Sequence, residues 1–94
     1  FSADEDGFSL MINNADGKLS GGFSADEDGG SLMIGNADGK LVGSFSAKEY
    51  GGILTTYNEH EVRTGYFGTN TEKDGSVALY DRYGDVGWSA SGKK

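Results

Sequence analysis

Residues 23–44 read FSADEDGGSLMIGNADGKLVGS and are a second copy of residues 1–22, which makes the chain a tandem repeat. The two copies differ only at the four pairs Phe8/Gly30, Asn13/Gly35, Ser20/Val42 and Gly22/Ser44. A diverged third copy begins at Phe45 and a fourth at Phe67. Such a period indicates that one supersecondary unit is added per repeat. We therefore expect one repetitive β domain over residues 1–94, a piece of a longer chain, with repeats 1–22, 23–44, 45–66 and 67–94.

Each of the first two copies contains two turn signals, which in the second copy are Asp26-Glu27-Asp28-Gly29 and Asn36-Ala37-Asp38-Gly39. Asp-Gly is favoured where a tight turn needs a positive φ angle. Apolar residues between the turns recur with period two, and no stretch has the 3.6-residue period of a helix. The sequence predicts antiparallel hairpin units with no helix and eight strands, at residues 9–12, 18–25, 31–34, 40–47, 53–57, 62–67, 76–80 and 86–90.

The larger apolar residues of these strands are the candidate core. Period-two alternation places Phe45 on one face together with Leu41, and Ser44 and Ser46 on the other. Hydrophobic residues make up 35% of the chain and 17 residues are glycine, so a single chain of this size has little core of its own. The predicted core residues are Leu10, Ile12, Phe23, Leu32, Ile34, Leu41, Phe45, Leu54, Phe67 and Leu79.

Three arrangements would bury such strands: a β-meander, a single-chain β-solenoid, and three chains intertwined into a triangular β-prism. A nearly exact repeat with one Phe per unit suits identical layers stacked along an axis. Association of three chains also explains how so short a chain obtains enough core. We therefore expect an all-β, intertwined trimeric β-prism or β-helix shaft, with the solenoid and the meander as alternatives.

The net charge of the chain disfavours some classes of binding partner. The chain has 15 Asp and Glu against 8 Lys and Arg, a net charge of −7. Nucleic acids and anionic membrane surfaces attract a positive face, so neither is expected to bind. The longest aliphatic runs are three residues, such as residues 32–34, which is too short for membrane insertion. Self-association, as a homotrimer or a filament, is the expected interaction.

The residues predict no enzyme. The chain has no cysteine and one histidine, His60, which stands between Glu59 and Glu61 in an expected turn. A metal or general-base site would need partners that converge on this ring. The acidic turns, with Asp4 and Asp6 or Asp26 and Asp28, offer oxygen ligands for Ca²⁺. They lack the bidentate Glu of a calcium-binding loop, so no cofactor is expected and solvated turn acids are favoured over a Ca²⁺ site.

Aromatic residues concentrate in the second half of the chain. Seven of the eleven, including every Tyr and the Trp, follow residue 48. Flat rings beside polar groups are typical of surfaces that bind sugars. Alternatively, these rings close the end of a core, because terminal repeats are atypical. The candidate contacts for a glycan or a surface receptor are Tyr57, Tyr80, Tyr83 and Trp88.

Two stretches resemble a known kind of repeat. Residues 28–41 read DGGSLMIGNADGKL and residues 74–86 read DGSVALYDRYGDV. They are similar to short bacterial tandem β-repeats with Asp-Gly and Gly-Lys turns, including those of fibre shafts, surface stalks and phage tail fibres. The resemblance implies a structural or display role and carries no catalytic residues. The third copy departs from it, because Glu59-His60-Glu61 replaces Ala37-Asp38-Gly39, which leaves the turn type at residues 58–61 open.

These observations lead to two functional expectations. The first is a structural repeat element of an extracellular or virion fibre, stalk or filament, located outside the cell, on a cell surface or on a virion surface. The second is a carbohydrate- or receptor-binding module that uses the aromatic C-terminal half.

Overall fold

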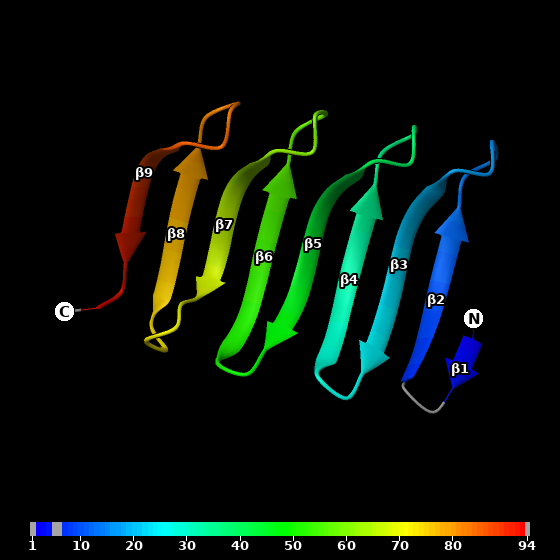
Figure 1. Cartoon of the computed structure of the whole chain (residues 1–94), viewed down its shortest axis with the longest axis horizontal. Helices are drawn as coiled ribbons and strands as arrows, with labels where there is room; N and C mark the ends of the chain where they lie inside the picture. Colours follow the sequence, from blue (N-terminus) through cyan, green and yellow to red (C-terminus); the bar gives the residue numbers. More distant parts are fainter. Residues whose placement is uncertain (1, 5–6, 94) are drawn as a thin grey trace.

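The computed structural model describes residues 2–4 and 7–93, and these residues form a single antiparallel β-sheet with no helix. Its strands follow the order of the chain, so each strand pairs with the next (Figure 1). The eight predicted strands are confirmed as β2–β9, and a short strand, β1, precedes them. The strands are β1 (Ser2–Asp4), β2 (Gly7–Asn13), β3 (Leu19–Asp26), β4 (Gly29–Gly35), β5 (Leu41–Lys48), β6 (Gly51–Tyr57), β7 (Arg63–Thr69), β8 (Gly75–Tyr80) and β9 (Val86–Ser91).

The sheet is open and one layer thick. It measures 44 × 31 × 13 Å, and two packed sheets would already lie about 10 Å apart before their outer side chains are counted. The connectivity is that of the β-meander, one of the expected alternatives, and all strand pairing in the described residues is within the chain. Sheets of many strands usually twist strongly, and flat ones are generally stabilised by stacking against another layer.

Turns of two kinds join the strands (Figure 1). The upper turns, at residues 14–18, 36–40, 58–62 and 81–85, each begin with Asn or Asp. In the second of them, the Asn36 backbone N–H donates to the Lys40 carbonyl at 2.9 Å, and Asn36 Oδ1 accepts the N–H groups of Asp38 and Lys40. The side chain thus satisfies backbone donors that the strand ladder leaves over. The lower turns, at residues 27–28, 49–50 and 70–74, close the opposite ends of the hairpins. The last of them has the hydrogen bonds of the upper turns, because the Asn70 N–H donates to the Asp74 carbonyl at 2.8 Å and Asn70 Oδ1 accepts the N–H groups of Glu72 and Asp74.

The turn at residues 58–62 retains the geometry of its counterparts despite its different sequence. The Asn58 N–H donates to the Val62 carbonyl at 3.0 Å, and Asn58 Oδ1 accepts the N–H of His60 at 2.9 Å. The fourth residue of the turn has a positive φ in each case, supplied by Gly17, Gly39 and Gly84 elsewhere but by Glu61 here (φ 64°). The Asn or Asp at the first position therefore determines the turn. Glycine at the fourth position only reduces the conformational strain of a positive φ angle.

Glu61→Gly is expected to raise the free energy of unfolding by about 0.5–1 kcal/mol. The left-handed conformation is unfavourable for a residue with a Cβ, and part of the gain is offset by the greater freedom of glycine in the unfolded chain. Urea unfolding measures the change. Gly39→Ala, at the equivalent position, serves as the reverse control and should destabilise by a similar amount. Equal stability of both variants and the parent would contradict this account of the turn.

A β-bulge recurs beside every upper turn, and because of one of these bulges the prediction that Leu41 shares a face with Phe45 is wrong. The register shifts at Ile12/Asn13, Ile34/Gly35, Thr56/Tyr57 and Leu79/Tyr80. After the second shift Leu41 pairs with Gly35, whereas Gly43 pairs with Ile34. Leu41 therefore lies on the face opposite Phe45, where it borders a small hollow of about 90 Å³ with Leu19 and Met33. Strict alternation fails here because a bulge adds one residue to one strand.

Candidate functional site

One face of the sheet is apolar across its whole width. The strand register sets Leu10 opposite Phe23, and Leu32 opposite Phe45, so that large side chains from successive strands form continuous rows. None of the described strand residues that point to this side is Asp, Glu, Lys or Arg. We call this surface the apolar face; its large side chains are Leu10, Ile12, Phe23, Leu32, Ile34, Phe45, Leu54, Phe67, Val77, Leu79 and Trp88.

The side chains of the apolar face have no second layer over them. Those predicted to form the core, Leu41 excepted, lie here and are 40–67% exposed in the single chain. Among the described residues, the buried hydrophobic side chain is Ile53, on the other face. The predicted role of the apolar-face residues as a core therefore stays a prediction, because it requires a second layer of protein over this face.

The surface of the apolar face is uneven, with protruding side chains and hollows between them. Phe45 stands between two hollows, one of about 300 Å³ that reaches Phe23 and one of about 610 Å³ that reaches Phe67. Leu54 and Gly52 line the larger hollow. Protruding rings that alternate with hollows of this size offer shape complementarity to another apolar surface.

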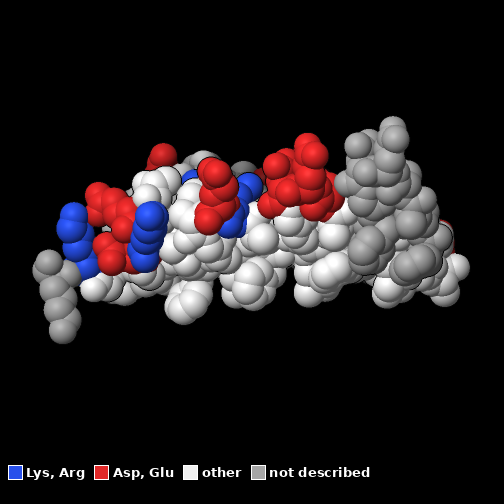
Figure 2. All heavy atoms as spheres, turned by 90° about the horizontal axis from the view of Figure 1, so that it is seen from below, with Lys and Arg blue, Asp and Glu red and all other residues white. Residues whose placement is uncertain are grey.

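Charged side chains lie away from this face. Figure 2 shows Asp, Glu, Lys and Arg gathered along one side of the slab, while the opposite side is formed by other residues. Exposure of so much contiguous apolar surface to water is unfavourable, and surfaces of this kind are typical of interaction sites.

The opposite face, which we call the polar face, carries small and polar side chains together with aromatic ones and some aliphatic ones, such as Met11, Met33 and Leu41. Ser24 and Ser31 share a hydrogen bond between their hydroxyl groups at 3.1 Å. Farther along, the Arg63 guanidinium lies over the Tyr80 ring, 4.8 Å from its centroid. These two residues and Tyr66 line a hollow of about 580 Å³ with Asn70, and the Tyr66 hydroxyl donates to the Thr69 carbonyl at 2.9 Å.

The four predicted ligand contacts do not converge on one place. Tyr57 pairs with Arg63 and lies on the polar face, as does Tyr80. Trp88 pairs with Leu79 and lies on the apolar face. Tyr83 is 77% exposed in an upper turn, where the Arg82 guanidinium is 5.9 Å from its ring centroid. The candidate contacts are thus divided among two faces and a turn.

Arg63 and Tyr66 line the hollow of about 580 Å³ on the polar face but were not among the predicted ligand contacts. Alternation along β7 would have placed Tyr66 opposite Phe67 and therefore on the polar face. The position of Arg63 follows from the bulge at Thr56/Tyr57, which the sequence does not reveal.

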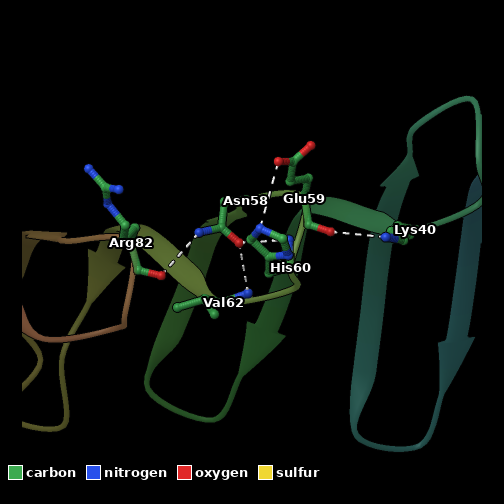
Figure 3. Close-up of polar contacts among 6 residues, drawn as sticks. All are labelled: Lys40, Asn58, Glu59, His60, Val62 and Arg82. Atoms are coloured by element: carbon green, nitrogen blue, oxygen red, sulfur yellow. Dashed lines mark hydrogen bonds and ion pairs between the residues drawn. The ribbon is translucent and has the colours of Figure 1, made fainter.

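The upper turns are linked to one another along the edge of the sheet (Figure 3). The Asn58 side-chain amide donates to the Arg82 carbonyl in the next upper turn at 3.3 Å, and Lys40 Nζ donates to the Glu59 carbonyl at 3.2 Å. His60 lies in the same turn, with Nε2 3.7 Å from a Glu59 carboxylate oxygen, and both side chains are at least 75% exposed. The two hydrogen bonds join neighbouring repeats along this edge of the sheet.

The acidic turns were the candidate calcium ligands. Asp6 and the side chain of Asp4 lie outside the described residues. Asp26 Oδ1 accepts the backbone N–H of Asp28 at 2.9 Å, which is a turn-forming role. In the described part of the chain, no three Asp, Glu, His or Cys side chains form a group that could hold a metal ion. That part likewise has no helix long and apolar enough to cross a membrane.

Comparison with known proteins identifies no relative: no protein-family model matches the chain, and no curated protein is significantly similar to it. The function must therefore be inferred from the sheet itself.

Proposed function

We propose that this chain is a structural repeat element that assembles with further copies of itself into a fibre, stalk or filament of the cell exterior or of a virion. The observation that carries the proposal is the uncharged apolar face, whose large side chains are about half exposed on a sheet one layer thick. A homotrimeric prism is the assembly we favour. The apolar repeat, the linked turns and the resemblance to fibre-shaft repeats support the same function.

Self-association through the apolar face predicts a mass in solution above that of one chain. Light scattering after size exclusion should give a multiple of 9.9 kDa, which stays constant over concentration for a closed prism and increases with concentration for a filament. Leu54→Glu, which places a charge in the middle of the apolar face, should reduce this mass to that of one chain, because an unpaired charge is strongly disfavoured in an apolar interface. Lys48→Glu, which places the same charge at an exposed position of the polar face, should keep the mass of the assembly. A parent protein that has the mass of one chain at every concentration contradicts the proposal.

A second candidate function is glycan binding at the hollow of the polar face. The observation that favours it is the grouping of Tyr66, Tyr80 and Arg63 around a cavity of about 580 Å³. Aromatic rings stack on the apolar faces of sugars, and guanidinium and amide groups bind their hydroxyls. In an assembly that buries the apolar face, this hollow faces outward and stays accessible.

Glycan binding at this hollow makes Tyr80 and Arg63 essential and Trp88 dispensable. A glycan array should identify a ligand for the parent protein, and calorimetry should show at least tenfold weaker binding by Tyr80→Ala and Arg63→Ala. Trp88→Ala is the matched control, because its ring lies on the opposite face of the sheet. An array without hits, or equal loss from all three variants, would count against this site.

A further inference from the structure

The partner that fits the apolar face best is two further copies of the same chain. We propose that each chain forms one complete wall of a three-sided prism, with three apolar faces turned inward around a threefold axis. This inference rests on the proposed function and specifies its geometry. Here the strands of a wall all come from one chain, as the pairing within the sheet has them, and the chains are not interleaved strand by strand.

The sizes of the side chains across the apolar face favour this geometry. The middle row, at the centre of the strands, is large from β2 to β8, as in Leu32, Phe45 and Leu54, and ends in Ala90 in β9. From β3 to β6 the row nearest the lower turns is small, with Ala25 paired to Gly30 and Ala47 paired to Gly52. The row nearest the upper turns alternates larger residues with glycine from β2 to β7, as in the pair Ile34 and Gly43, and ends in the pair Leu79 and Trp88. The face is therefore thickest along its middle.

The interior of a three-sided prism varies in depth in the same way as the side chains of the apolar face vary in size. Strands of seven residues are about 23 Å long, and the centre of a triangle with sides of this length lies about 7 Å from each side. A Leu or Phe side chain is required to reach that centre, whereas less space remains near the corners, where neighbouring walls converge. Two sheets packed face to face are instead separated by about 10 Å over their whole area. The rows of Ala and Gly would leave voids in such a sandwich, which are unfavourable.

Threefold rotation brings different edges of the walls together at each corner. The lower edge of one wall then meets the upper edge of the next, so the small row containing Ala47 lies against the row containing Ile34. Small residues on one side thus accommodate branched residues on the other. The area also suffices, because a face of up to 44 × 31 Å exceeds the ~800 Å² per partner that standard interfaces bury.

Charge agrees with this arrangement. The apolar face presents no charged side chain in its described strand residues, while Arg63 and the charged turns lie on the polar face or at the strand ends. In the prism these groups are located on the outside and along the corners, where they stay hydrated. Closure around an axis also removes the need for any other protein to cover the apolar face.

The test combines the mass of the parent protein with bulky substitutions in the corner row. The parent should have three times the chain mass of 9.9 kDa. Ala47→Phe and, independently, Ala25→Phe should reduce the mass to that of one chain, because the prism places this row against the Ile34 row of the next wall, where a ring has no space. Ala47 is exposed in the single sheet, so a ring at this position can point into solvent there, and circular dichroism verifies that the strands are retained in both variants. Ser44→Phe, on the polar face of the same strand, should keep the threefold mass.

The possible failures are distinguishable. A parent of twice the chain mass, stabilised by Ala47→Phe as the ring fills a void, would overturn the prism in favour of a two-layer sandwich and leave the proposed function standing. A threefold mass that survives both corner substitutions would overturn the placement of this row at a corner. A parent of one chain mass would overturn the prism and the proposed function together.

Discussion

Phe45→Ala should lower the free energy of unfolding of the assembled protein by about 3–5 kcal/mol, as is typical when a buried phenylalanine is truncated. In the single chain the Phe45 side chain is 55% exposed, so the isolated sheet should lose far less. The difference between these two values is the contribution of the second layer. Urea unfolding above and below the concentration at which the assembly dissociates measures both.

The control for this prediction is another aromatic residue of the same repeat array. Tyr83 is 77% exposed at the tip of an upper turn, and Tyr83→Ala should change stability by less than about 1 kcal/mol at any concentration, as surface substitutions generally do. Unfolding curves of Phe45→Ala that match the parent at high concentration would show that the ring is not covered by other chains.

Gly68→Ala should destabilise the sheet by about 3 kcal/mol or abolish its folding. A Cβ at this position would meet the backbone oxygen of Gly52 and lie 2.8 Å from the Cα of Ile53. Both atoms belong to the backbone of β6, so they move only if the strand moves. Displacement would disturb Ile53, a buried hydrophobic side chain that is 7% exposed. Overpacking of this kind typically costs 1–3 kcal/mol and occasionally more.

A second strand glycine provides the matched comparison. A Cβ at Gly43 would be 3.7 Å from the nearest atom, the Thr55 carbonyl oxygen, which is an ordinary contact. Gly43→Ala should therefore be neutral or stabilise by up to about 1 kcal/mol, since it restricts the unfolded chain. Urea midpoints of both variants test the pair, and similar midpoints would mean that strands β6 and β7 are less closely packed than described.

The period of the repeat and its turn residues were enough to predict the strands. Asn36 and its equivalents bind their own turn backbone, and alternation between turns distinguishes strand from helix. Such local interactions depend on neighbours in sequence. The same alternation makes Leu32 and Phe45 core candidates, and the register places both on the apolar face. It misplaces Leu41, because a bulge depends on the number of residues in the partner strand.

The candidate ligand contacts were likewise predictable only in part from the sequence. Tyr57, Tyr80 and Trp88 are recognisable from composition as an aromatic cluster, yet only the register shows that Trp88 is on the opposite side of the sheet from Tyr80. The hollow around Arg63 and Tyr66 combines residues from different strands. Its members become neighbours through pairing and cannot be read from their spacing along the chain.

Local conformation and composition are enough to predict an all-β repeat with Asn- and Asp-led turns, alternating strands and a core too thin for one chain. The pairing of the strands in chain order as one open layer, and the bulges that set which side chains share a face, are visible only in the folded sheet. The same holds for the position of the predicted core residues, which, Leu41 excepted, lie exposed on the apolar face. Strand order and register depend on hydrogen bonds between residues distant in sequence, which no local pattern specifies.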